Sequence, residues 1–178
     1  MINQFYAQNS KLVEKILKEL QKNCRLNLDE IGKKCGCSRY KVAKIMKELE
    51  KKNVIVGYSA VVNPTKTNLN YFILLVKRTS QPFDEDMIKR IPFTREVDFV
   101  PNVNINSIAT LYVHGSYDWV LAFTAPSIAE AKEFCNKIFK YYSKYIENLE
   151  LLTIVAPFRM NGLIMASNEE IEQMIKIL

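Results

Sequence analysis

The densest set of side chains that could bind another molecule lies between residues 38 and 51. Tyr40, Lys44, Lys47 and Lys51 recur there at intervals of three and four, which places them on one face of a helix, with Arg39 and Lys41 at its N-terminal end. The set is Ser38, Arg39, Tyr40, Lys41, Lys44, Lys47 and Lys51. Lys and Arg on a helix can contact phosphates, and residues of its first turn can reach base edges. The sequence therefore predicts a DNA-binding face, with a merely solvated charged face as the alternative.

The opposite face of the same segment is apolar and must be buried. Its stripe follows the i, i+3, i+4, i+7 pattern of Val42, Ile45, Met46 and Leu49. Ser38 is a favoured N-cap, and Asn53 tolerates the left-handed conformation that often ends a helix. We therefore expect a helix that packs on one side and faces a partner on the other.

Two shorter patterns before this segment predict the elements that position it. Residues 11–22 carry apolar side chains on one helical face, and Asn27 with Glu30 forms a capping box at the start of a second helix. Gly36 ends that helix, and a single residue separates it from Ser38. Two helices joined by such a tight turn form a helix-turn-helix, in which the second helix is the recognition helix.

The charge distribution agrees with a DNA-binding first third. Residues 1–57 hold 13 Lys and Arg against 6 Asp and Glu, a balance of +7, and residues 58–178 hold 12 against 13, a balance of −1. A basic segment of this kind attracts a polyanion such as double-stranded DNA. No Gly-rich phosphate loop, paired-carboxylate motif or nucleophile constellation is apparent, so we predict that the protein is not an enzyme.

The remainder of the chain changes to a pattern of alternating strands and helices. Residues 54–62 are rich in β-forming residues and predict a connecting strand that stops at Asn63-Pro64. The elements expected next are a strand at 71–78, a helix at 83–90, strands at 108–113 and 119–124, a helix capped by Ser127, and a strand at 149–155. This β-α-β-β-α-β order is the ferredoxin-like arrangement. Ser167 and Glu170 predict the start of a final helix at 168–178.

The predicted fold class is therefore α+β. An N-terminal (winged) helix-turn-helix domain is joined by a strand linker to a ferredoxin-like βαββαβ domain, and a short C-terminal helix follows. We assign residues 1–57 to the DNA-binding domain, 58–69 to the linker strand and turn, 70–160 to the ferredoxin-like domain and 161–178 to a C-terminal helical extension.

Residues 10–70 resemble the leucine-responsive regulatory protein/AsnC (feast/famine) family of transcription regulators. The matching stretches are "ILKEL", "NCR", "LDEIGKKCGCS" and "KIMKELEKKNVIVGYSAVVNP". The second half resembles the ligand-sensing domain of that family, with "HGSYDW" at the place of its Gly-x-x-Asp hairpin. The chain departs from the family at Asn53, where glycine is usual, at residues 94–106, which look like an insertion, and at the helix 168–178, which extends beyond the usual end.

The resemblance implies a homodimer, able to assemble into a tetramer or octamer, whose DNA binding responds to a small-molecule effector, usually an amino acid. It implies that the ferredoxin-like domain carries the effector pocket, at the turn formed by Gly115, Ser116, Tyr117 and Asp118. Asp118 could pair with an α-ammonium group, and N–H groups of the turn could bind a carboxylate. An ordinary hairpin turn is the alternative. A side chain at a hairpin end is usually exposed, so we expect Asp118→Ala to cost little stability.

The cysteines and the single histidine do not predict a metal site. Cys35-Gly36-Cys37 offers two thiolates, whereas a closed structural zinc site needs four ligands. The sole histidine, His114, lies in the other domain. We therefore expect no metal or cofactor and interpret the cysteines as small core residues.

Two other functions are compatible with the same architecture. The stretch "HGSYDW" loosely resembles part of the sirohaem decarboxylases, which are enzymes, and an architectural DNA-binding protein would need no effector. The basic helix favours a regulator over the enzyme. No signal peptide is visible, and the longest plainly apolar run, residues 71–76, is too short to cross a bilayer, so we expect a cytoplasmic protein without membrane contact.

Overall fold

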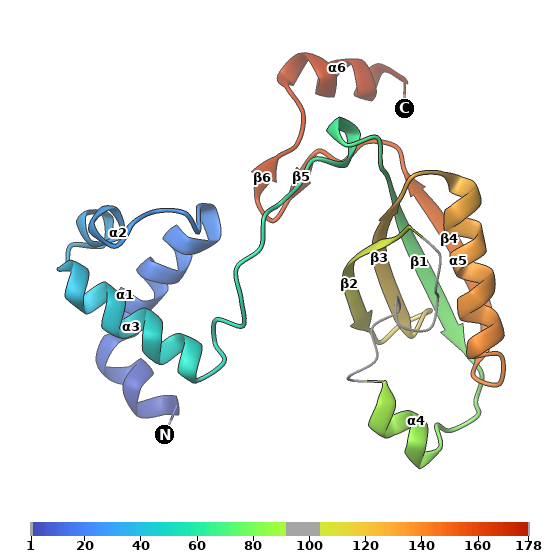
Figure 1. Cartoon of the computed structure of the whole chain (residues 1–178), viewed down its shortest axis with the longest axis horizontal. Helices are drawn as coiled ribbons and strands as arrows, with labels where there is room; N and C mark the ends of the chain where they lie inside the picture. The colour runs from blue at the N-terminus through green and yellow to red at the C-terminus, as the bar shows by residue number, and fades with distance from the viewer. Residues whose placement is uncertain (1, 92–103, 178) are drawn as a thin grey trace. The chain divides into compact units, whose positions relative to one another are not determined.

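The structure, a computed structural model, describes residues 2–91 and 104–177 of the chain. It contains two compact units, one formed by Met1–Val62 and Phe158–Glu170, the other by Asn63–Pro157 and Ile171–Leu178. Each unit has its own hydrophobic core, and the two cores share no residue. Figure 1 shows the three helices of the first unit and the sheet of the second. The predicted α+β fold, a helix-turn-helix followed by a ferredoxin-like sheet, is confirmed.

The first unit begins with three helices, α1 (Ile2–Lys22), α2 (Leu28–Cys35) and α3 (Arg39–Lys51). Helix α1 starts well before residue 11, where the apolar pattern predicted it. The core between these helices consists of Val13, Ile16, Leu20, Ile31, Cys35, Val42, Ile45 and Leu49. Three of the four predicted stripe residues of α3 are fully buried, and Met46 packs against them. The apolar side of α3 therefore faces α1 and α2.

Local side-chain hydrogen bonds determine where α2 and α3 begin and end. The Asn27 side chain accepts the N–H of Glu30, and the Glu30 carboxylate accepts the N–H of Asn27, both at 2.9 Å. Ser38 Oγ accepts the N–H of the third residue of α3 at 3.3 Å. Gly36 (φ 73°) and Asn53 (φ 53°) adopt the left-handed conformation after the two helices. The predicted capping box, N-cap and helix ends are confirmed.

Gly32 of α2 lies in close contact with the turn that leads into α3. A Cβ atom at this position would lie 2.6 Å from the carbonyl oxygen of Cys37 and 3.5 Å from the amide nitrogen of Arg39. The Cys37 N–H donates to the Gly32 carbonyl at 2.9 Å across the same contact. Glycine therefore allows the turn to pack directly on α2, which positions the first residues of α3.

The strand predicted at 54–62 is not formed. The N–H groups of Val54 and Ile55 donate to the Leu49 carbonyl, at 2.8 and 3.2 Å, and residues 56–63 have no regular secondary structure. A strand needs a second strand for its backbone hydrogen bonds, and no strand in the described part of the chain pairs with this segment. The Tyr58 hydroxyl instead donates to Glu50 Oε1 at 2.8 Å, which ties the segment to the end of α3.

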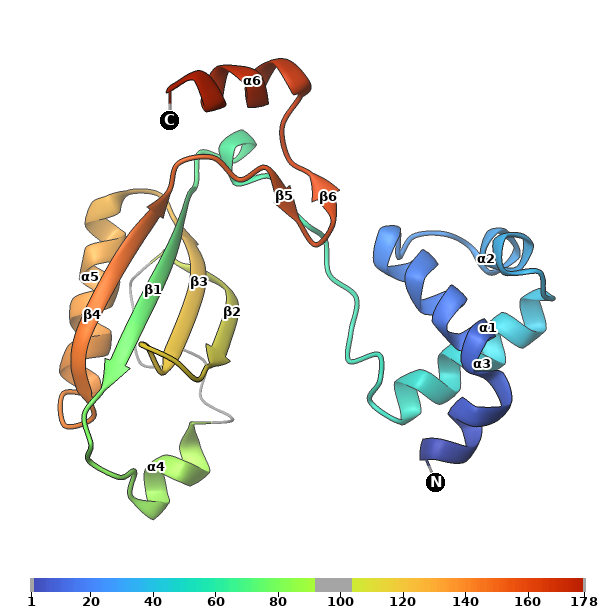
Figure 2. The same cartoon turned by 180° about the vertical axis from the view of Figure 1, so that it is seen from behind.

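The second unit contains a four-stranded antiparallel sheet. Its elements in chain order are β1 (Asn70–Arg78), α4 (Glu85–Arg90), β2 (Asn106–Tyr112), β3 (Trp119–Ala125), α5 (Ile128–Tyr141) and β4 (Ile146–Ile154), preceded by a 3₁₀ turn at Pro64–Lys66. The strand order is β2-β3-β1-β4, as in a ferredoxin-like sheet. Helix α5 packs against β1, β3 and β4 on one side of the sheet, as both views show (Figures 1 and 2).

Helix α4 begins two residues later than predicted. Asp84 is its N-cap, because its side chain accepts the N–H of Met87 at 2.9 Å. Phe83 is consequently outside the helix and packs against the core of the unit. The predicted insertion at 94–106 lies mostly outside the described residues.

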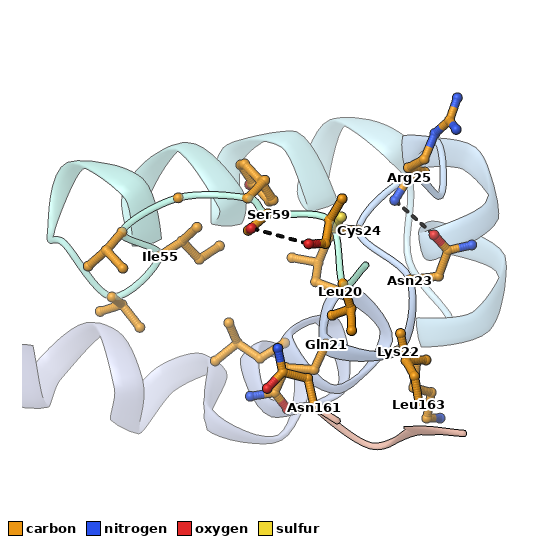
Figure 3. A pocket seen from close by; sticks show the side chains of 17 residues that line it. Leu20, Gln21, Lys22, Asn23, Cys24, Arg25, Ile55, Ser59, Asn161 and Leu163 are labelled. Atoms are coloured by element: carbon orange, nitrogen blue, oxygen red, sulfur yellow. Dashed lines mark hydrogen bonds between the residues drawn. The ribbon is translucent and has the colours of Figure 1, made fainter. Parts of the chain in front are cut away.

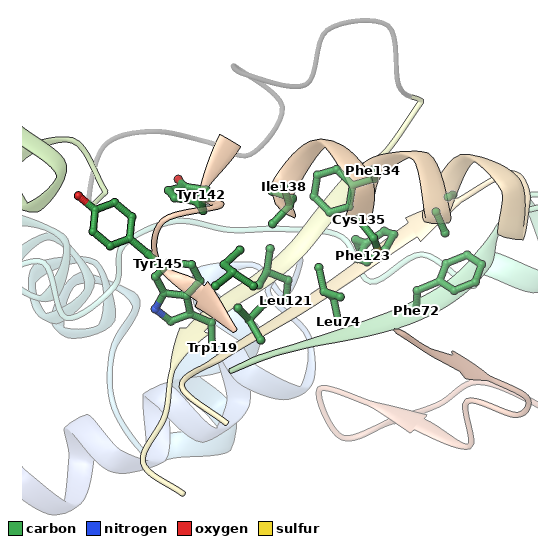
Figure 4. Close-up of a cluster of buried hydrophobic side chains, with 14 residues drawn as sticks. Phe72, Leu74, Trp119, Leu121, Phe123, Phe134, Cys135, Ile138, Tyr142 and Tyr145 are labelled. Atoms are coloured by element: carbon green, nitrogen blue, oxygen red, sulfur yellow. The ribbon is translucent and has the colours of Figure 1, made fainter. Parts of the chain in front are cut away.

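The core of the second unit lies between α5 and the sheet (Figure 4). Phe72, Leu74 and Val76 of β1 alternate inward, as a half-buried strand requires. Phe123 of β3 meets Phe134 of α5 with ring centroids 4.9 Å apart. These contacts fix the sheet against α5, and with it the hairpin that joins β2 to β3.

The other face of the sheet is apolar and partly exposed, and we call it the open face. Strand alternation and register place Tyr71, Ile73, Leu75, Ala109, Leu111, Val120, Ala122, Leu152 and Ile154 on it. Leu111 is 53% exposed and Leu152 is 38% exposed. In a folded protein such side chains are usually covered when they form a contiguous surface.

The C-terminal segment contains a hairpin that the sequence patterns did not predict. Strands β5 (Arg159–Met160) and β6 (Leu163–Ile164) pair around Asn161 and Gly162, which both have positive φ, 49° and 80°. Helix α6 (Asn168–Ile177) follows, as predicted. Among the described residues, none of the helices combines the length and the apolar content that a bilayer crossing requires.

Candidate nucleic-acid interface and effector turn

The seven residues predicted to contact DNA all belong to α3 or to its N-cap, and all are exposed. Tyr40, in the first turn, is 80% exposed. The stripe of Val42, Ile45 and Leu49 is buried on the opposite side. Helix α3 therefore presents one continuous polar and cationic face to solvent.

The side chain of Arg39, in the first turn of α3, is held only weakly by its own unit. Arg39 Nη1 lies 3.4 Å from Asp29 Oδ2, and the two side chains are 55% and 60% exposed. The Arg39 guanidinium carbon also lies 5.9 Å from the centroid of the Tyr40 ring. An exposed ion pair contributes about 0–1 kcal/mol, so a phosphate or a base can replace Asp29 as the partner of Arg39 at little cost.

These side chains border a shallow hollow of about 600 Å³ at the turn between α2 and α3. Its lining residues are Asp29, Gly32, Lys33, Gly36, Cys37, Ser38, Arg39 and Tyr40. The sequence patterns did not single out Lys33, which lies in the last turn of α2 and lines the same hollow as Ser38. The structure adds this cation to the same surface.

Not every basic side chain of the first unit is available to a partner. Glu19 Oε1 lies 2.8 Å from Lys22 Nζ, and Glu19 Oε2 lies 2.9 Å from Lys34 Nζ. The hydrogen bonds from Lys22 and Lys34 hold the pKa of the Glu19 carboxyl below its usual value. Because Lys34 is on α2, this carboxylate also links α1 to α2.

A second hollow of the first unit, about 750 Å³, lies at the C-terminal end of α1 (Figure 3). Its walls include Leu17 and Leu20 of α1, residues 54–61, and Asn161 and Leu163 of the hairpin. In the turn after α1, the Arg25 N–H donates to Asn23 Oδ1 at 3.0 Å. None of the seven predicted DNA contacts lines this hollow.

The turn predicted to bind an effector is fixed to the sheet through Asp118. Asp118 Oδ2 accepts the N–H of Arg78 at 2.8 Å. The Asp118 N–H donates to the Val76 carbonyl at 2.9 Å, and the Asp118 carbonyl accepts the N–H of Val113 at 2.8 Å. The Asp118 side chain is therefore not free, and we now expect Asp118→Ala to lower the stability, because a hydrogen bond to a charged group contributes about 1.5–3 kcal/mol.

The other three residues of the turn differ in their contacts. The Tyr117 hydroxyl donates to the Glu150 carboxylate of β4, and this hydrogen bond raises the pKa of Tyr117. Gly115 and Ser116 are exposed. Within the described chain, the N–H groups of residues 115–117 have no backbone acceptor. Among the described residues, the turn thus combines N–H groups that have no backbone acceptor with the carboxylate of Asp118.

Arg78 is the residue of this site that the sequence did not reveal. Its Nη1 donates to the Tyr112 hydroxyl at 3.0 Å, and its Nη2 donates to the Gln81 carbonyl at 2.9 Å. Its guanidinium carbon lies 3.6 Å from the centroid of the Phe83 ring. Tyr112 and Asp118 are 34 and 40 residues away in the chain, so no local spacing could predict these contacts.

Two of the four cysteines agree with a packing role, whereas Cys24 is exposed and Cys37 is half-buried. Cys35 and Cys135 are buried, and burial raises the pKa of both thiols, that of Cys135 to about 11. In the part of the chain that the structure describes, no three His, Cys, Asp or Glu side chains are grouped as metal ligands. His114 lies exposed beside the turn.

Known proteins similar to this chain are regulators of transcription. Residues 10–56 match the winged helix-turn-helix DNA-binding family. The uncharacterized HTH-type transcriptional regulator YezC of Bacillus subtilis is 33% identical over 104 residues, which are 54% of this chain and 75% of that protein. The leucine-responsive regulatory protein of Haemophilus influenzae is 27% identical over 123 residues, 67% of this chain and 68% of that protein. The chain belongs to the leucine-responsive regulatory protein/AsnC family.

Similarity to this family extends over both units. The uncharacterized HTH-type regulator PYRAB00550 of Pyrococcus abyssi is 27% identical over 154 residues, 85% of this chain and 94% of that protein. The regulator NMB0573 of Neisseria meningitidis, solved in complex with L-Met, has a TM-score of 0.65 and 17% identity, over 86% of this chain and 94% of that one. This structural likeness shows the shared fold. As a member of the leucine-responsive regulatory protein/AsnC family, the protein is a DNA-binding transcription regulator.

Proposed function

We propose that this regulator binds operator DNA as a homodimer through α3, and that an amino acid bound at the 115–118 turn changes its DNA affinity. The observation that carries the proposal is the exposed cationic face of α3, which is opposite a fully buried stripe. In this proposal residues 1–57 bind DNA, 58–69 connect, 70–160 sense the effector and form the oligomer, and 161–178 are an extension. DNA as the partner supports a cytoplasmic location.

The roles of the α3 side chains follow from their place on the helix. Ser38, Arg39, Tyr40 and Lys41 are in or next to the first turn, which enters the major groove in a helix-turn-helix, so we assign them to base edges. Lys44, Lys47 and Lys51 are one to three turns further along and are assigned to phosphates. Lys33, which lines the same hollow as Ser38, is a further phosphate contact.

The open face of the sheet supports a dimer. It carries aliphatic side chains from all four strands, and the residues Leu111 and Leu152 are 53% and 38% exposed to solvent. A second copy of the same face would bury this surface, and a two-fold dimer would present two α3 helices to a pseudo-palindromic site. Leu111→Asp would then yield a monomer in light scattering. A dimer that persists in this variant would contradict the assignment of the interface.

An amino acid is the effector that the turn favours. The unpaired N–H groups of residues 115–117 suit a carboxylate, and the carboxylate of Asp118 suits an ammonium group. The L-Met complex of the Neisseria regulator, which has the same fold, supports this class of ligand.

Salt-dependent DNA binding tests the central claim. Lys44→Ala/Lys47→Ala should weaken binding to every duplex and reduce the slope of log K against log salt by about one for each lost phosphate contact. Arg39→Ala should instead alter the order of preferred sequences. The matched control is Lys132→Ala/Lys140→Ala, which removes two exposed lysines from α5. If the control and the α3 double variant lose affinity equally, α3 is not the DNA contact.

A further inference from the structure

One residue, Arg78, holds both ends of the turn between β2 and β3. Its backbone N–H donates to Asp118 Oδ2 at 2.8 Å, at the end of the turn that leads into β3. Its side-chain Nη1 donates to the Tyr112 hydroxyl at 3.0 Å, on the last residue of β2. The segment between these contacts, residues 113–118, includes all four residues assigned to the effector.

Strand alternation places the Arg78 side chain on the α5 side of the sheet, in line with Phe72, Leu74 and Val76. The β1–β4 register shifts between Lys77 and Arg78, so that Arg78 is opposite Ile146 and Glu147 is bulged. The Arg78 guanidinium is then fixed by the Gln81 carbonyl, 2.9 Å from Nη2, and by the Phe83 ring, 3.6 Å from its carbon.

Phe83 connects this guanidinium to the aromatic part of the core. The Phe83 ring lies parallel to that of Trp119, at 4° and 5.8 Å, and Trp119 meets Tyr142 at 5.5 Å. Figure 4 shows Trp119, Tyr142 and Tyr145 gathered at this end of the sheet. Trp119 directly follows Asp118 and is the single tryptophan of the chain. Its environment therefore changes when Arg78 or the turn moves.

We propose that Arg78 is a positioning residue of the effector site, which sets ligand affinity without touching the ligand. It fixes the Asp118 carboxylate and both ends of the turn before the ligand arrives, so binding does not have to order them. The backbone N–H of Arg78 holds Asp118, and the guanidinium holds the Tyr112 end of the turn. The guanidinium is planar and can donate to Tyr112 and Gln81 while it stacks on Phe83, which a lysine cannot do. This inference rests on the proposed amino-acid site.

The test uses the full-length protein and isothermal titration with the twenty amino acids. Arg78→Lys keeps the charge but loses the planar stack and the paired donors, and it should weaken binding of the ligand found for the wild type by about tenfold or more. Tyr112→Phe removes one of these contacts and leaves the stack in place, so it should weaken binding in the same direction by a smaller factor. Lys77→Gln, the exposed neighbour, is the control and should bind as the wild type does.

A second measurement needs no ligand. Amide hydrogen exchange of residues 113–118 should be faster in Arg78→Lys, with a shifted Trp119 emission, while exchange of α5 and ligand-free DNA affinity stay at wild-type values. Unchanged ligand affinity in both variants, or unchanged exchange of the turn, would overturn the inference. If the wild type binds no amino acid, the proposed effector class is wrong, whereas the exchange measurement still decides whether Arg78 holds the turn.

Discussion

Gly32→Ala is the most specific test of how the helix-turn-helix is assembled. The added Cβ would lie 2.6 Å from the Cys37 carbonyl oxygen, whereas real Cβ atoms essentially never come closer than 3.0 Å to another heavy atom. The two atoms must therefore separate by at least 0.4 Å. A backbone oxygen cannot rotate away as a side chain can, so the turn and the first residues of α3 must move together.

The expected magnitude follows from two opposing effects. Overpacking of a well-packed interior costs about 1–3 kcal/mol. Alanine is a better helix former than glycine by about 0.8–1 kcal/mol, which offsets part of that cost in α2. Since a rigid backbone contact belongs at the upper end of the overpacking range, we expect a net loss of about 1–2 kcal/mol in the free energy of unfolding of the first unit.

Urea unfolding followed by circular dichroism at 222 nm measures this loss, with the free energy taken from linear extrapolation. The matched control is Gly57→Ala, because a Cβ at Gly57 would have no heavy atom within 4 Å. Affinity for specific DNA should also fall in Gly32→Ala, by about the 1–3 kcal/mol of one base contact, because the first turn of α3 is displaced. If Gly32→Ala is as stable as Gly57→Ala, the close approach does not position α3.

Three further outcomes follow from the first unit. Hydrogen bonds from its two lysine partners lower the pKa of Glu19, so the ionised carboxylate stabilises the folded unit above the usual pKa of 4.5, and this stabilisation is lost as the pH falls below it. In Glu19→Gln, the free energy of unfolding measured between pH 3 and 6 should lose this pH dependence. Burial, together with the hydrogen bond to Glu50, raises the pKa of Tyr58 to about 12. The protonated phenol therefore stabilises the folded unit below pH 10, and this stabilisation is lost as the pH rises through 12. In an absorbance titration at 295 nm, Tyr58→Phe should remove a phenol that ionises near pH 12. Ser38→Ala removes the N-cap of α3 and should cost about 1 kcal/mol in urea unfolding, and an unchanged stability would show that the 3.3 Å hydrogen bond contributes nothing.

The helix-turn-helix could be predicted almost completely from the sequence, because local chemistry determines it. The capping box at Asn27, the left-handed residues Gly36 and Asn53 and the N-cap Ser38 all act within a few residues of their own position. The buried stripe of α3 follows from the helical repeat alone. What periodicity could not reveal is the close contact at Gly32, which depends on two helices meeting.

The predictions from the sequence failed where the structure depends on residues far away in the chain or on a second strand. Residues 54–62 have the composition of a strand, but a strand forms only with a paired neighbour, and none is present in the described chain. The hairpin at 159–164 has two-residue strands, too short for alternation to be visible, although Asn161-Gly162 is a strong signal for its turn. Asp118 looked like a free hairpin carboxylate because its partner, Arg78, is 40 residues away.

The separation of the two hydrophobic cores has a consequence for how the protein melts. One core contains eight buried side chains of α1, α2 and α3, and the other lies between α5 and the sheet, with no residue in common. Loss of one core therefore leaves the buried side chains of the other core in place, and heat absorption should resolve into two transitions rather than one. A molecule that binds a single unit raises the midpoint of that unit alone. Scanning calorimetry would thus assign DNA and amino acid to their units in one experiment, without a single substitution in the chain.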